Sequence, residues 1–242
     1  MTIIVACHHK AGSTYARKSF SEIARILDYK FSFYGFGEAP LSADAYYPAK
    51  QILCFSHARY DHLVKVKSLF DCVACTLIHI IRDPRTLIVS AARYHIDSDE
   101  PWLSIPKAAY GGKSYKQLLE SLSCYGEQLI FEMSNGSRGT LQEMSKIYFG
   151  AIATLTIKLE DISWDSSGLP HQQLSEHLVA DSMMQNEVKR VFIKNSLFAL
   201  PSTPRHSRTR VLPASRKDIK CKALKVYSDI YGDLHLRLGY GE

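Results

Sequence analysis

The alternation of short apolar runs with longer amphipathic segments is the feature that most restricts the fold of this chain. Residues 3–7 and 76–81 are apolar at almost every position and rich in β-branched side chains, which is typical of strands buried on both faces of a sheet. In residues 13–27, by contrast, apolar side chains recur at helical spacing. We therefore expect an α/β fold in three layers, with a mostly parallel sheet of about five strands and helices on both faces.

The same periodicities place the other elements. They predict short strands at residues 31–34, 51–56 and 152–159, and helices over about 60–70 and from Pro84 through Tyr94. Residues 97–150 have a mostly helical pattern after an opening that proline and glycine interrupt. A chain of 242 residues suits one large α/β domain. We expect a single domain over residues 1–242, with 97–150 as a helical insertion.

Composition limits the classes of function. The longest apolar runs are too short to span a bilayer, and residues 1–7 lack the basic n-region of a signal peptide. Six cysteines without framework spacing fit a reducing compartment, so we expect a cytoplasmic protein. The net charge of +6 is compatible with nucleic acid, an anionic membrane or an anionic small molecule. The only dense basic stretch, residues 205–210, also suits a solvated surface loop.

A glycine-containing segment, residues 8–15, lies between the first predicted strand and the first predicted helix. Such a turn directs backbone N–H groups and the positive end of the helix dipole towards an anion. Gly12 permits close approach of the backbone, and Ser13 and Thr14 add hydroxyl donors. Lys10 adds a positive charge. The segment also fits an ordinary strand–helix turn capped by Ser13, and it lacks the Walker A pattern.

A second motif occupies residues 80–90. Arg82 follows a predicted strand, and Ser90 comes eight residues later in the next helix. Because ligands of open α/β sheets bind outside the carboxyl ends of the strands, this pair is placed to hold a phosphate. A structural cap formed by Arg82 and Asp83 is the alternative interpretation.

Together, the two motifs resemble the PAPS-dependent sulfotransferase superfamily, where PAPS is 3′-phosphoadenosine 5′-phosphosulfate. In that family, a strand–loop–helix reading Pro-Lys-x-Gly-Thr-Thr binds the 5′-phosphosulfate, and an Arg…Ser pair eight apart binds the 3′-phosphate. The resemblance implies a P-loop-like sulfotransferase fold, with Arg82 and Ser90 at the 3′-phosphate. It assigns the 5′-phosphosulfate to Lys10, Ala11, Gly12, Ser13, Thr14 and Tyr15. This sequence departs from the family pattern at two positions, where His9 replaces proline and Tyr15 replaces tryptophan.

Further segments agree with this resemblance. Residues 51–57 resemble the family strand that ends in Thr/Ser-His, which implies that His57 is the general base and Lys10 assists the leaving phosphate. Ser196 is a weaker candidate near the nucleotide. Residues 156–162 resemble a late family strand, with Leu159 in place of its tyrosine. Arg208 and Arg210 match a C-terminal basic loop over the 3′-phosphate by location and charge only, and one of them is expected there.

Other candidate sites are weaker. Cys72 and Cys75 have the spacing of half a zinc site or a redox pair, but nothing in the sequence completes such a site, and we interpret them as packing residues. Glu160 and Asp161 are neighbours on a predicted strand and so face opposite ways. A shared acid/base role is therefore unfavourable. We prefer the interpretation that one of the two carboxylates forms a hydrogen bond to a loop or cap.

The resemblance implies an enzyme that moves a sulfuryl group from PAPS to an acceptor hydroxyl or amine, with PAP as product and no metal. The expected partner is a small-molecule or glycan acceptor, with neither nucleic acid nor membrane. Residues 97–150 are expected to line the acceptor pocket, and Glu100 is the alternative base to His57. The acceptor and the oligomeric state cannot be read from the sequence. Two other functions stay open: a P-loop-like nucleotide kinase, and a non-catalytic basic module that binds nucleic acid through residues 205–210.

Overall fold

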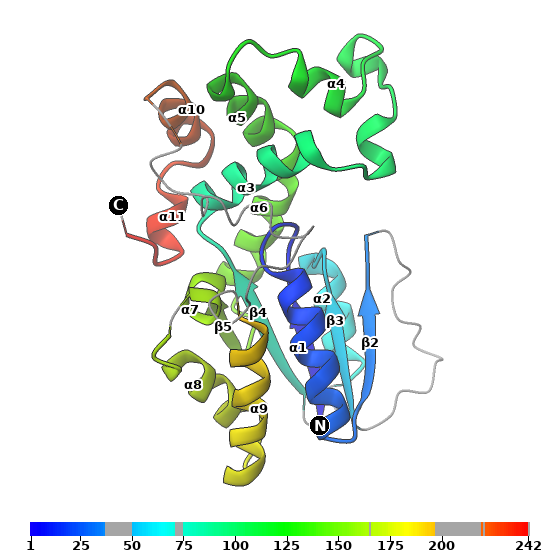
Figure 1. Ribbon diagram of the computed structural model, residues 1–242, viewed down its shortest axis with the longest axis vertical. Coiled ribbons are helices and arrows are strands. Elements are labelled where there is room, and N and C mark those ends of the chain that lie inside the picture. The colour runs from blue at the N-terminus through cyan, green and yellow to red at the C-terminus, as the bar shows by residue number, and fades with distance from the viewer. Residues whose placement is uncertain (37–49, 71–74, 165, 197–218, 220, 242) are drawn as a thin grey trace. The chain divides into compact units, whose positions relative to one another are not determined.

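The computed structural model of the chain describes residues 1–36, 50–70, 75–164, 166–196, 219 and 221–241 (Figure 1). The chain divides into two compact units, Met1–Arg82 with Glu143–Thr203 and Asp83–Gln142 with Pro204–Glu242. The first unit holds the sheet, and the described elements of the second are helical. The single domain expected over residues 1–242 stays a prediction. No helix within the described ranges is long and apolar enough to cross a membrane.

A five-stranded, fully parallel sheet forms the centre of the first unit. Its strands are β1 (Thr2–Ala6), β2 (Lys30–Tyr34), β3 (Gln51–Phe55), β4 (Cys75–Ile81) and β5 (Leu155–Lys158), in the order β2-β3-β1-β4-β5. Val5 of β1 lies opposite Cys54 of β3 on one side and Ile78 of β4 on the other. The strands that precede Lys10, His57 and Arg82, which are β1, β3 and β4, are therefore consecutive in the sheet. The predicted parallel α/β fold is confirmed.

One face of the sheet packs against four helices (Figure 1). These are α1 (Ser13–Ile26), α7 (Leu159–Trp164), α8 (Leu169–Leu178) and α9 (Ser182–Asn195). Alternate β1 residues such as Ile3 and Val5 point into this layer, where Phe20 of α1 meets Phe192 of α9 with ring centroids 5.4 Å apart. The apolar stripe predicted for residues 13–27 is thus the buried face of α1.

The opposite face packs against α2 (Tyr60–Ser68) and the C-terminal end of α6 (Gly136–Phe149). Ile4 of β1 lies here with Leu63 and Val66 of α2 and Ile147 of α6. Because successive side chains of a strand point to opposite faces, a strand apolar at every position needs cover on both sides. The predicted three layers are confirmed.

The second unit holds residues 97–142 of the helical segment that was predicted for residues 97–150. Its elements are α3 (Pro84–Asp97), η1 (Pro101–Ser104), η2 (Ala108–Tyr110), α4 (Tyr115–Glu120), α5 (Tyr125–Ser134), the start of α6, α10 (Cys221–Tyr231) and α11 (Leu234–Arg237). The α5 helix contacts both α3 and α10.

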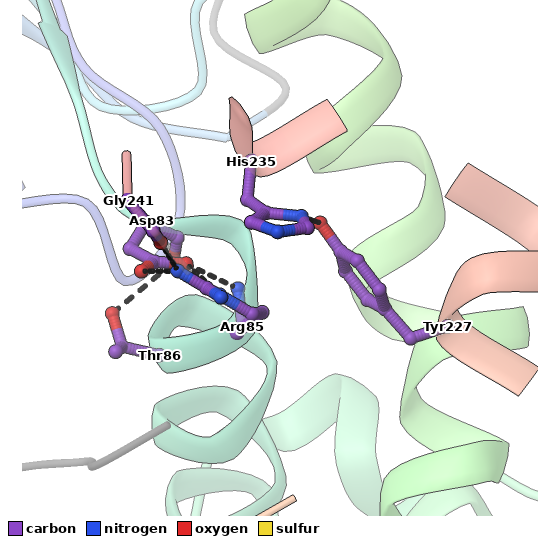
Figure 2. A network of polar contacts seen from close by, with 6 residues as sticks. All are labelled: Asp83, Arg85, Thr86, Tyr227, His235 and Gly241. Carbon is purple, nitrogen blue, oxygen red and sulfur yellow. Dashed lines mark hydrogen bonds and ion pairs between the residues drawn. The ribbon is translucent and has the colours of Figure 1, made fainter. Parts of the chain in front are cut away.

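A buried ion pair fixes the start of α3 (Figure 2). Asp83 is the N-cap residue: its Oδ1 accepts from the Arg85 backbone N–H at 2.9 Å, and its Oδ2 lies 2.9 Å from Arg85 Nη2. The same Nη2 donates to the Gly241 carbonyl at 2.5 Å, while Thr86 Oγ1 donates to the Asp83 carbonyl at 3.1 Å. Arg85 therefore ties the C-terminal segment to the start of α3.

A second buried network surrounds Glu132, which is fully buried. Its Oε2 lies 2.8 Å from both His95 Nδ1 and the Tyr115 hydroxyl, and its Oε1 accepts from Ser137 Oγ at 2.7 Å. Burial, followed by the Glu132 charge, raises the pKa of Tyr115. These partners satisfy the carboxylate inside the helical unit, as a buried charged group requires.

Candidate functional site

The segment between β1 and α1 forms a tight turn with two left-handed residues. Lys10 has φ 59° and Gly12 has φ 85°. The Ala11 N–H donates to the His8 carbonyl at 2.9 Å and closes the turn. A Cβ atom on Gly12 would lie 2.5 Å from Leu159 Cδ1. Glycine is therefore favoured at position 12 both by its backbone conformation and by close packing.

The first turn of α1 begins at this glycine. Gly12 is the N-cap residue, and no side chain of the described residues caps this end. The alternative in which Ser13 is the cap is wrong, because Ser13 is already the first helical residue. The helix thus presents its positive dipole end and first N–H groups beside Lys10, the arrangement that suits a phosphate. Ala11 is buried, Ser13 is half-buried and Thr14 is exposed.

Arg82 joins the second motif to the first. It follows β4 directly, and its Nη1 donates to the Lys10 carbonyl at 2.7 Å. A guanidinium group carries five N–H donors, so one such side chain can bond to several acceptors at once. The structure thus brings two motifs, 72 residues apart in the sequence, into direct contact.

His57 reaches the same edge of the sheet from β3 and is half-buried. Its ring stacks on His9, with centroids 5.4 Å apart, and makes a T-shaped contact with Phe36, with centroids 5.2 Å apart. Its Nδ1 lies 2.9 Å from Ser56 Oγ. Because β1, β3 and β4 are parallel neighbours, the residues that follow them converge on one edge of the sheet.

A buried histidine pair lies among these strands and was missed by the sequence reasoning. The Nε2 atoms of His8 and His79 are 2.8 Å apart, and both side chains are almost fully buried. Burial lowers the pKa of His8 to about 3, against the opposing charge of Glu143, and burial also lowers the pKa of His79. Both rings are therefore neutral at neutral pH, with one donating to the other.

The remaining predicted site residues lie as follows. Tyr15 is buried; its hydroxyl donates to the Phe192 carbonyl at 3.3 Å, and burial raises its pKa. Ser196 is the C-cap residue of α9, and its Oγ donates to the Ile193 carbonyl at 2.5 Å. Ser90 is buried in α3, within the second unit. Arg208 and Arg210 lie outside the described residues. Binding roles for these residues stay predictions.

The region after β5 requires a correction. The strand predicted over 152–159 is shorter, and α7 begins at Leu159. Glu160 and Asp161 therefore lie in the first turn of a helix, where carboxylates favour the positive dipole end, and not on a strand. Among the described residues, no group of three or more His, Cys, Asp or Glu is arranged to hold a metal ion.

Comparison with known proteins identifies the class of fold. The chain is similar to the solved structure of mouse sulfotransferase SULT7A1 complexed with PAP, with a TM-score of 0.54 over 98% of this chain and 88% of that one. The two sequences are 15% identical. No family model matches the chain, and no curated protein matches its sequence. The likeness shows a sulfotransferase-like fold.

Proposed function

We propose that this chain transfers a sulfuryl group from PAPS to an acceptor hydroxyl or amine. The observation that carries the proposal is the bond between Arg82 Nη1 and the Lys10 carbonyl at the N-terminus of α1. It joins a positive side chain to a loop whose helix N-terminus suits an anion, with His57 at the same sheet edge. A donor that carries two separate phosphate groups suits such a paired arrangement.

The nucleotide roles follow from the two motifs. Lys10, Gly12 and the first N–H groups of α1 hold the 5′-phosphosulfate. Arg82 binds the 3′-phosphate, together with Ser90 and with Arg208 or Arg210, whereas Ser196 is the weaker candidate near the base of the nucleotide. The PAP in the mouse sulfotransferase structure supports this choice of nucleotide.

The chemistry proposed is an in-line displacement, by analogy with phosphoryl transfer. The acceptor oxygen or nitrogen forms a bond to sulfur while the bond from sulfur to the phosphate oxygen breaks. The acceptor proton passes to His57, and Lys10 stabilises the charge that develops on the departing phosphate oxygen. None of these steps needs a metal ion, because the lysine charge and the helix N–H groups act on the leaving group.

The acceptor is proposed to be a small molecule or a glycan. Residues 97–150 supply the helical segment expected to bind it. The cytoplasm stays the expected location, on the ground of the cysteine pattern. Among the described cysteines, Cys7, Cys54 and Cys124 are free thiols, which agrees with that expectation.

Calorimetry with PAP, ADP and ATP tests the nucleotide assignment. PAP should bind much more tightly than ADP, and Arg82→Ala should remove about 2–5 kcal/mol of PAP binding while leaving ADP nearly unchanged. Equal affinities for PAP and ADP would reject the 3′-phosphate site, and preference for ATP would favour a nucleotide kinase.

Transfer of labelled sulfate from PAPS to a phenol, an aliphatic alcohol, an amine and an amino sugar tests the reaction. On whichever acceptor reacts, His57→Gln should lower turnover by about a hundredfold to ten-thousandfold and leave PAP affinity nearly unchanged. Full activity of this variant would show that another residue is the general base. Glu100, which accepts from the Tyr94 hydroxyl at 2.7 Å and from Trp102 Nε1 at 2.6 Å, is then the next candidate.

A further inference from the structure

Ser56 lies between the backbone of β2 and the ring of His57. Its backbone N–H donates to the Tyr34 carbonyl at 3.0 Å and so continues the ladder between β2 and β3 by one residue. Its side chain is also buried, and Oγ lies 3.2 Å from the same carbonyl and 2.9 Å from His57 Nδ1. The position of this hydroxyl is thus set by the sheet and not by a loop.

The two contacts of the Ser56 hydroxyl determine the direction in which its proton points. A serine hydroxyl has one proton to donate and two lone pairs that accept. The Tyr34 carbonyl is only an acceptor, so its contact with Oγ requires the Ser56 proton. Because the Ser56 proton is donated to the Tyr34 carbonyl, Oγ can only accept in its contact with His57. His57 must then carry a hydrogen on Nδ1 and donate it to Oγ. The opposite orientation would place two lone pairs against each other at the 3.2 Å contact.

We infer that Ser56 is a positioning residue that holds neutral His57 as the Nδ1–H tautomer, with the lone pair on Nε2. The inference rests on the proposed function for its catalytic meaning, because Nε2 is then the atom that receives the acceptor proton. Neutral imidazole has one donor nitrogen and one acceptor nitrogen, and the partner of one nitrogen selects the role of the other. The stacked His9 ring and the T-shaped contact with Phe36 restrict the plane of the same imidazole.

In this arrangement His57 transfers the proton and its neighbour Ser56 positions the ring. His57 handles the acceptor proton, whereas Ser56 makes no proposed contact with donor or acceptor. Loss of the Ser56 hydroxyl should therefore lower kcat without changing the KM for PAPS or the affinity for PAP. A base held as the wrong tautomer loses its function even when its position is intact.

The tautomer can be measured directly in a long-range proton–nitrogen NMR spectrum of the isotope-labelled full chain at about pH 8, where an ordinary histidine is neutral. His57→Gln identifies the His57 signals by their loss. The wild type should show a protonated Nδ1 and an unprotonated Nε2. Ser56→Ala should shift the ring towards the other tautomer, and Ser56→Thr, which keeps the hydroxyl, should restore the wild-type pattern.

Turnover on the acceptor found in the transfer screen supplies the second measurement. Ser56→Ala should lower kcat about tenfold, the factor that corresponds to one intramolecular hydrogen bond, and Ser56→Thr should recover most of it. A wild-type spectrum with a proton on Nε2, or an unchanged tautomer in Ser56→Ala, overturns the inference. The spectra of the wild type and of His57→Gln need neither nucleotide nor turnover, so they decide the tautomer even if the chain transfers no sulfate.

Discussion

Acid should destabilise the first unit through the buried pair of His8 and His79. Burial lowers the pKa of His8 from 6.5 to about 3, so the folded chain keeps this ring neutral while the unfolded chain takes up a proton below about pH 6.5. The stabilisation from the neutral ring is complete above pH 6.5 and is lost as the pH falls towards 3. Each pH unit in that window costs about 1.4 kcal/mol, which gives roughly 2 kcal/mol at pH 5 for His8 alone.

Because the pKa of His79 is lowered in the same direction, it adds to this loss. The test compares urea unfolding, followed by tryptophan fluorescence, at pH 7.5 and pH 5.0 for the wild type and for His79→Gln. This variant removes one titrating ring, and its amide can still bond to His8. It should lose less stability than the wild type on acidification, because one of the two buried titrating rings is gone.

Ile78→Val is the matched control for this comparison, since it lies in the same strand and is fully buried. It should cost about 0.5–1.5 kcal/mol at both pH values and keep the wild-type pH dependence. If the wild type is equally stable at both pH values, or if His79→Gln loses as much as the wild type, the buried neutral pair is refuted.

Two further predictions concern residues at helix starts. Gly12→Ala should destabilise the chain by about 1–3 kcal/mol and weaken PAP binding, because alanine is strained at φ 85° and its Cβ meets Leu159. Thermal unfolding measures the loss of stability, and calorimetry measures the loss of PAP affinity. Gly139→Ala, a helical control with nothing within 4 Å of the added Cβ, should be neutral or stabilise by up to about 1 kcal/mol, and equal effects at both glycines would contradict the reasoning. Arg85→Ala should cost about 3–5 kcal/mol in urea unfolding, because it leaves Asp83 buried without its ion-pair partner, and a loss below about 1 kcal/mol would show that the pair contributes little.

The strands that apolar runs define were predictable because a parallel sheet buries them on both faces. Both β1 and β4 were located from this pattern alone. The end of β5 was not, because the alternating residues around Leu159 fit a strand as well as a helix start. Two acidic residues, Glu160 and Asp161, favour the helix start over the strand, because carboxylates are stabilised in the first turn of a helix. Because both residues were expected on the strand, this preference went unused.

The candidate site was partly predictable for the same reason. Parallel topology places the carboxyl ends of β1, β3 and β4 at one edge, so convergence of Lys10, His57 and Arg82 on that edge followed from order alone. The histidine pair did not follow, because it depends on the register in which Ala6 lies opposite His79. Register is set by tertiary pairing, and no spacing between residues 8 and 79 signals it.

The discontinuous first unit has a consequence for how the chain emerges during synthesis. In the finished sheet, β4 lies between β1 and β5, yet β5 is made only after residues 83–142. At roughly 5–20 residues per second, adding the intervening stretch takes on the order of ten seconds. During that time, the nascent chain holds β4 as an open edge whose N–H and C=O groups can pair with another chain. The strand that leads to Arg82 is therefore open to pairing with other chains until β5 has been made.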